Sequence, residues 1–193
     1  TYKYLYVYLY LSFEESMKKI ILATLISGVM SSSALAVDAG SGTVTFSGSI
    51  IEAPCSIAPG EENQEVALGQ VSNVTLDNGS ESSAQPFQIK LEGCNLKGDN
   101  QVAVTFKGTE AGTNTGYLQI TGDATGAAVK IMNGSGAQIK VNSSAKQNYV
   151  EGNNTLKFQA SLIGLQLVDK DSKPLPVTPG QFQAVTNFTL AYN

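Results

Sequence analysis

The chain has 193 residues, 15% of them charged, a formal net charge of −4, and neither histidine nor arginine. This length corresponds to one globular domain. The acidic balance without a basic cluster argues against nucleic acid or an anionic membrane surface as a partner.

The first 36 residues are predicted not to belong to the folded domain. Residues 1–16 carry a Tyr/Leu run and precede Met17, so we interpret them as an upstream, non-native leader. Residues 17–36 have a basic start, an apolar stretch and a small-residue cleavage site, which together predict a signal peptide ending before Val37. A rival interpretation joins both apolar runs into a membrane anchor. It is weaker because acidic residues separate the runs and the second run is shorter than the ~20 residues that a span needs.

The start of the mature chain shows the alternation of a β-strand over residues 43–52. Gly42, Val44, Phe46 and Gly48 share one face of this segment. The segment is either a spare strand for another molecule or the first strand of its own domain, and its part from residue 50 onward is expected to pair within the domain.

The two cysteines, Cys55 and Cys94, are predicted to form a structural disulfide because export takes the chain to an oxidising compartment. A metal site would need more ligands, and a nucleophilic cysteine would need a base that a chain without histidine supplies poorly. We therefore expect no enzyme activity, no metal, no cofactor and no small-molecule substrate.

The rest of the chain alternates short strand-like runs with turn clusters rich in Gly, Asn, Ser and Asp, and offers almost nothing helical. This pattern predicts an all-β antiparallel sandwich. In residues 155–168 the apolar positions change parity at Gly164, which predicts a bulge or a strand that passes between two sheets. The remaining predicted strands are residues 65–71, 85–91, 102–107, 117–121, 128–132, 138–141 and 182–192.

An ordered set of marks resembles the chaperone-usher pilins, in particular the type 1 major fimbrial subunit family. The marks are the run from Gly42 to Gly48, the Ala-Pro before Cys55, the second cysteine, the segment 156–160, Gly180 as the glycine fourteenth from the end, and the penultimate tyrosine, Tyr192. The resemblance extends over the whole mature chain.

The resemblance implies an incomplete immunoglobulin-like β-sandwich that lacks its final strand and is completed by donor-strand exchange. Residues 50–193 would form the pilin domain and residues 37–49 the N-terminal donor extension. Within the extension the donor positions would be Gly40, Gly42, Val44 and Phe46. The acceptor groove and the chaperone contact would involve Gly180, Phe188, Leu190, Tyr192 and Asn193.

The same resemblance implies a structural subunit that polymerises head-to-tail and supports cell adhesion. Its partners would be identical or related pilin subunits, a periplasmic chaperone and an outer-membrane usher, and it would pass through the periplasm to an extracellular fimbria. Two alternatives stay open: a minor pilus adaptor, and a secreted carbohydrate-binding β-sandwich module.

Overall fold

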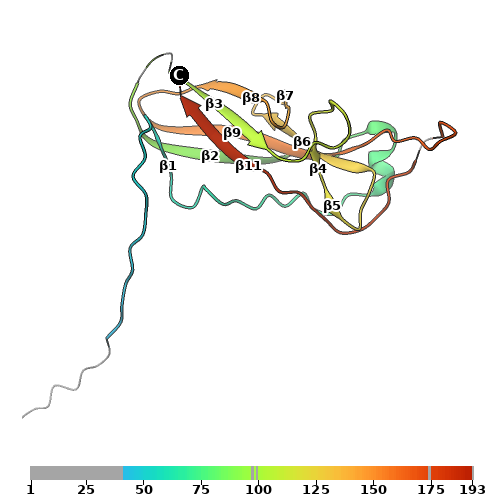
Figure 1. Cartoon of the computed structure of the whole chain (residues 1–193), viewed down its shortest axis with the longest axis horizontal. Helices are drawn as coiled ribbons and strands as arrows, with labels where there is room; N and C mark the ends of the chain where they lie inside the picture. The colour runs from blue at the N-terminus through green and yellow to red at the C-terminus, as the bar shows by residue number, and fades with distance from the viewer. Residues whose placement is uncertain (1–40, 97, 99, 174, 193) are drawn as a thin grey trace, which may run out of the picture. The chain divides into compact units, whose positions relative to one another are not determined.

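The computed structural model describes residues 41–96, 98, 100–173 and 175–192 (Figure 1). Contacts divide the chain into two units, Thr1–Ser49 and Ile50–Asn193. The expected leader, the signal peptide, Gly40 and Asn193 lie outside the described residues. Within the described ranges, no helix is long and apolar enough to cross a membrane.

The larger sheet of the second unit is antiparallel and is built around two long strands. Along β2 and β9 most side chains alternate between exposed and buried positions, as expected when one face of a sheet covers a core. Phe87 lies opposite Phe158, and Ile89 lies opposite Leu156. The strands of this sheet, in spatial order, are β1 (Ser56–Ile57), β2 (Gln85–Cys94), β9 (Gly152–Gly164), β6 (Ala127–Asn133) and β4 (Leu118–Gln119), with β7 (Gln138–Ile139) also paired to β6.

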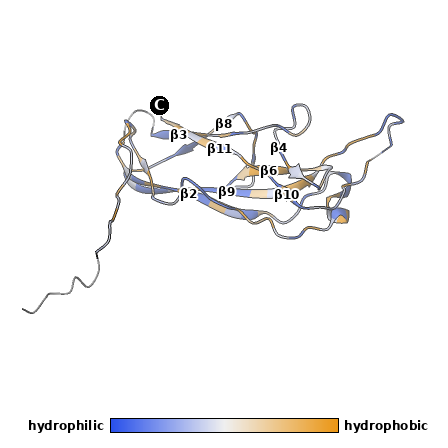
Figure 2. Cartoon of the chain, turned by 60° about the horizontal axis from the view of Figure 1, so that its bottom comes forward, coloured by the Kyte–Doolittle hydropathy of each residue, from blue (hydrophilic) through white to orange (hydrophobic). Residues whose placement is uncertain are grey.

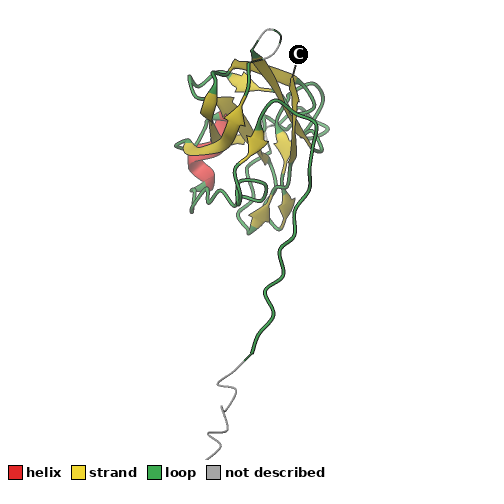
Figure 3. Cartoon of the chain, turned by 90° about the vertical axis from the view of Figure 1, so that its left-hand side faces the viewer, coloured by secondary structure: helices red, strands yellow, loops and turns green. Residues whose placement is uncertain are grey.

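The second sheet has three antiparallel strands in the order β11 (Asn187–Tyr192), β3 (Gln101–Lys107) and β8 (Ser144–Asn148). Its central strand buries Val102, Val104 and Phe106 on one face. A short separate ladder joins β5 (Thr121–Gly122) to β10 (Phe182–Gln183). Figure 3 shows the strands in yellow and the one short helix of the described residues in red at the margin of the sheets.

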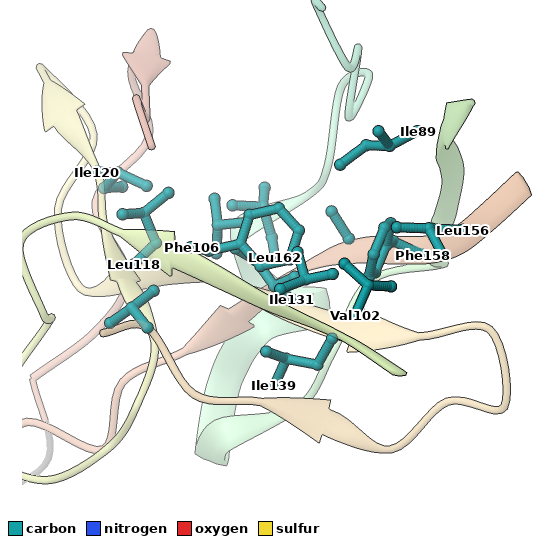
Figure 4. Packing of buried hydrophobic residues seen from close by; sticks show 14 of the residues in the cluster. Ile89, Val102, Phe106, Leu118, Ile120, Ile131, Ile139, Leu156, Phe158 and Leu162 are labelled. Atoms are coloured by element: carbon teal, nitrogen blue, oxygen red, sulfur yellow. The ribbon is translucent and has the colours of Figure 1, made fainter. Parts of the chain in front are cut away.

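Aromatic and aliphatic side chains from both sheets meet in one core (Figure 4). The Phe158 ring stacks on Phe87 with centroids 5.3 Å apart, and the Phe106 ring from the other sheet meets Phe158 edge-on at 5.2 Å. Strand β6 is hydrophobic along most of its length (Figure 2), which fits its central place in the larger sheet. The three rings therefore join the two sheets into a sandwich.

The predicted disulfide is confirmed: Cys55 is bonded to Cys94, 39 positions along the chain. Both cysteines are buried. Beside them the Asn95 amide donates a hydrogen bond of 2.9 Å to the Pro54 carbonyl, and Ser56 pairs with Glu92. The disulfide therefore ties the start of the domain to the end of β2.

Two predicted strands are wrong for this chain by itself. Residues 43–52, including the part from residue 50 that was expected to pair within the domain, form no strand, and neither do residues 65–71. Both segments have β-like sequences, but a strand exists only where a neighbour completes its hydrogen-bond ladder.

The prediction for residues 155–168 is wrong at its end, because β9 stops at Gly164 with neither a bulge nor a change of sheet there. A Cβ on Gly164 would collide with the Leu76 carbonyl oxygen, so the glycine allows a close approach of the short 3₁₀ helix η1 (Asn73–Gly79). The sequence predicted neither η1 nor β8. The predicted strand 182–192 is divided into β10 and β11.

Candidate functional site

A large cavity of about 1280 Å³ opens within the second unit, on the side where the two sheets are not joined by a strand. One wall is the extended segment 62–71, and the other is the segment 177–188 that leads through β10 into β11. Figure 1 shows both segments as long stretches with few strand arrows. We call this cavity the open groove.

The floor of the open groove is the hydrophobic core itself. Both sheets contribute to it, and most of the floor side chains are less than 9% exposed. Figure 4 shows several of them directed toward one another between the sheets. The buried floor residues include Ile89, Phe106, Leu118, Ile120, Ile131 and Leu162. A groove with such a floor matches apolar side chains far better than polar ligands.

The first wall, segment 62–71, is described in full and makes no backbone–backbone hydrogen bond to the rest of the described chain. Gln64 anchors it, because its side-chain amide donates to the Gln88 carbonyl at 2.8 Å and to the Glu61 carbonyl at 3.0 Å. Leu68 and Val71 are half-buried against the core. This wall thus keeps its backbone donors and acceptors available.

The second wall ends in β11, which is paired on one side only among the described strands. Its six residues pair with β3 in continuous register from Asn187 opposite Lys107 to Tyr192 opposite Val102. In an antiparallel pair, every second residue directs its N–H and C=O away from the partner strand. Half of β11 therefore presents an unsatisfied backbone edge, which is a template for another strand.

Burial along residues 182–192 alternates without a break between half-buried and exposed. The parity predicted from the sequence is correct, with Phe182, Phe188 and Leu190 on the inward face. These inward side chains stay only half-buried, whereas Val102 and Val104 of the neighbouring β3 are fully buried. The inward face of this strand is consequently only partly covered.

The structure distributes the predicted acceptor residues along the second wall. Gly180 and Phe188 line the open groove, whereas Leu190 and Tyr192 follow on the same face beyond its lining. Gly180 packs on the turn at Asp123 and Ala124, where a Cβ would come within 2.5 Å of the Ala124 amide nitrogen. The glycine is thus required by a close approach of two backbones.

At the carboxyl end of β11, the Tyr192 ring meets the Tyr149 ring edge-on, with centroids 5.8 Å apart. The Tyr192 hydroxyl is buried without a hydrogen-bond partner among the described residues. Burial raises the pKa of Tyr192 above its ordinary 10.0, and the neighbouring Tyr149 raises it further. Gln147, which faces Val102 from the other side, also has a buried side-chain nitrogen without a partner.

The predicted donor positions that are described lie in the first unit and are exposed. Val44 is 74% exposed and Phe46 is 91% exposed. Residues 41–49 form neither helix nor strand, and a Cβ on Gly42 would meet nothing within 4 Å. Neither large apolar side chain of this segment is therefore covered by the described part of its own chain.

Sequence reasoning missed the first wall as part of the site. It treated residues 65–71 as an ordinary strand, although they line the open groove as an unpaired segment. Val66 and Leu68 alternate with polar or small residues, which predicts a strand but carries no signal that the strand lacks a partner.

Taken together, the two sheets, the missing strand between them and the open groove define an all-β sandwich of the immunoglobulin-like pilin type. The family model described as "Fimbrial protein" matches residues 44–193. The chain belongs to this fimbrial protein family.

Relatives and solved structures agree with this family. The chain is 45% identical over 177 residues to the Fimbria A protein of Serratia marcescens, covering 91% of this chain and 98% of the relative. It is 46% identical over 166 residues to the Major MR/P fimbria protein of Proteus mirabilis, covering 85% and 91% respectively.

Among solved structures, a chaperone-usher pilus from a study of rod uncoiling matches with a TM-score of 0.70 and 28% identity, covering 81% of this chain and 98% of that chain. The P pilus rod subunit PapA matches with a TM-score of 0.62 and 28% identity, covering 73% and 100%. The protein is therefore a structural subunit of an extracellular bacterial fimbria and interacts with other pilin subunits.

Proposed function

We propose that the subunit polymerises by donating its N-terminal extension, residues 37–49, to the open groove of the next subunit. The domain boundary that this requires is supported by the division of contacts between Ser49 and Ile50. The single observation that carries the proposal is the open groove: a cavity with the hydrophobic core as its floor, bordered by two backbone edges that no strand of the described residues pairs.

The backbone chemistry of the two sides is complementary. An inserted strand can hydrogen-bond to the free edge of β11 and to segment 62–71, whose backbone groups have no partner in the described chain. Each such bond contributes about 0.5–1.5 kcal/mol net. Strand addition of this kind uses the backbone for affinity and alternating pockets for register.

The side-chain chemistry matches as well. The nine described residues of the extension, 41–49, span roughly 30 Å when extended. Val44 and Phe46 share a face and would enter the groove, while Gly42 and Gly40 would lie where the floor rises. Burying two large apolar side chains contributes roughly 3–6 kcal/mol.

The acceptor contact in this proposal comprises Gly180, Phe188, Leu190, Tyr192 and Asn193. Before assembly, a periplasmic chaperone would cover the same open edge and hold the carboxyl end of the chain, and an outer-membrane usher would exchange it for the next subunit. Export through the periplasm would follow from the signal peptide at residues 17–36. The role is structural and not catalytic, and the relatives named as major subunits favour the fimbrial shaft over a minor adaptor.

Deleting residues 37–47 after the signal peptide tests the proposal. The truncated subunit keeps the groove and the domain, so it should still be recovered in complex with the chaperone, but electron microscopy should show no fimbriae on the cells. Long fibres built from the truncated subunit would refute the donor assignment.

A further inference from the structure

The tripeptide Asn-Gly-Ser occurs twice in the described chain, at residues 78–80 and 133–135, in two different environments. In such a sequence the glycine amide nitrogen can attack the asparagine side-chain carbonyl carbon, because glycine has no side chain to obstruct the approach. Asparagine is accordingly among the thermolabile residues of proteins. The tripeptides are identical, and the fold surrounds each copy with different contacts.

At the second copy, the side chain of Asn133 is held. Its Oδ1 atom accepts hydrogen bonds from the Ser135 amide at 3.0 Å, the Ser135 hydroxyl at 2.8 Å and the Ala137 amide at 2.9 Å. The following glycine lies against β9, where its carbonyl accepts a bond from the Gln159 side chain. The Asn133 side chain must therefore break three hydrogen bonds at Oδ1 before its Cγ atom can reach the Gly134 nitrogen.

At the first copy, the side chain of Asn78 is exposed and makes no hydrogen bond within the described chain. The contacts that hold the turn around it leave the Asn78 side chain untouched: the Ser80 amide donates to the Asp77 carbonyl at 3.2 Å, the Gly164 amide donates to the Ser80 carbonyl at 3.1 Å, and the Gln166 side chain donates to the Asn78 backbone carbonyl at 3.0 Å. Asn78 has a left-handed backbone, φ 57°, which interrupts η1. Rotation of the Asn78 side chain therefore breaks no hydrogen bond of the described chain.

We propose that Asn78 is a site of spontaneous deamidation in this protein, and that the fold protects the identical tripeptide at Asn133. The Gly79 nitrogen, losing its proton to solvent, forms a bond to the Asn78 Cγ atom; the Cγ–Nδ2 bond then breaks and ammonia leaves. Water opens the resulting succinimide at either carbonyl and gives aspartate or isoaspartate. No oxidant or cofactor is needed.

The position gives the modification a structural consequence. Isoaspartate adds one atom to the backbone two residues after Leu76, a buried side chain of the open groove. On the other side, the Ser80 carbonyl accepts a 3.1 Å bond from the Gly164 amide. A longer backbone between these anchors shifts Leu76. The effect on subunit joining rests on the proposed function, whereas the modification itself does not.

The test uses fimbriae purified from cells and kept in warm, mildly alkaline buffer. Cleavage after Glu65 and Glu81 releases the fragment 66–81, and cleavage after Lys130 and Lys140 releases the fragment 131–140. Mass spectrometry with fragmentation locates the conversion in each. Because Asn133 must free itself from several hydrogen bonds, conversion at Asn78 should be at least about tenfold faster, or about 1.4 kcal/mol in barrier.

Two controls separate the fold from the sequence. In fimbriae that have been heated and are kept unfolded in denaturant, both copies should react at similar rates, since their tripeptides are identical. Gln166→Ala should speed conversion at Asn78 alone, and Ser135→Ala should speed it at Asn133 alone. Equal rates in intact fimbriae, faster conversion at Asn133, or a difference that persists in denaturant would overturn the proposal.

Discussion

Placing an aspartate at Phe46 should stop polymer growth, while the same substitution one residue earlier should not. Phe46 is 91% exposed in its own unit, so replacing it removes nothing from the fold of the subunit. In the proposed contact between two subunits, the substitution removes roughly 1.5–3 kcal/mol of favourable burial free energy. Keeping the new carboxyl group neutral at pH 7 costs about 4 kcal/mol more, from an ordinary aspartate pKa near 3.9.

The sum is about 6 kcal/mol, which raises the dissociation constant of the contact between subunits by roughly 10⁴-fold. Thr45 is the matched control because it is also exposed and occupies the opposite face of the same extended segment. Thr45→Asp adds the same charge at nearly the same place, but its side chain would point away from the groove.

Fimbriae on cells are counted by electron microscopy, and polymer is measured by immunoblotting of subunit ladders that resist denaturant without heating. The level of chaperone-bound subunit checks that each variant is exported and folded. Phe46→Asp should abolish ladders at a normal level of chaperone complex, and Thr45→Asp should keep them. Equal defects in both variants, or normal ladders from Phe46→Asp, would show that this face does not enter the groove.

Three other changes act on the domain itself. Replacing both Cys55 and Cys94 by serine removes a cross-link over 39 positions and should lower the free energy of unfolding by about 4 kcal/mol, measured by denaturant titration of assembled fimbriae. Gly164→Ala places a Cβ against the Leu76 carbonyl oxygen and should cost about 2 kcal/mol or more in the same titration, and an unchanged free energy of unfolding would contradict the packing argument. The pKa of Tyr192 is raised in the folded state, so the stability that its neutral form contributes is fully present below pH 10 and is lost as the pH rises through the folded-state pKa. Tyr192→Phe should therefore flatten the decline of the melting temperature at alkaline pH. An unchanged decline would argue against burial of the hydroxyl.

Strands that pair inside the domain were predictable from the sequence. Residues 85–91 and 102–107 alternate apolar and polar side chains, and both became strands with the expected faces because each lies between two partners or over the core. The disulfide was predictable as well, because two cysteines in a chain that is expected to reach an oxidising compartment leave one pairing.

The errors have a common physical cause. Residues 43–52 and 65–71 have strand-like sequences, but pairing depends on a neighbour that the isolated domain does not provide. The reverse holds for β8, whose polar sequence Ser-Ala-Lys-Gln-Asn has low strand propensity and is extended because β3 pairs with it. The candidate site was predicted for its second wall, where alternation extends to Tyr192, and was missed for its first wall.

The position of the Cys55–Cys94 bond determines how the subunit carries mechanical load. In the proposed fibre, tension enters each domain through the extension that precedes Cys55 and meets the covalent cross-link within a few residues. From there it passes directly to the end of β2, whose ladder with β9 is the longest in the domain. The covalent bond thus spares segment 62–71 and η1, which lie between the cysteines, the tension that enters through the extension, and the open groove bears only the pull of the neighbour's strand that it holds.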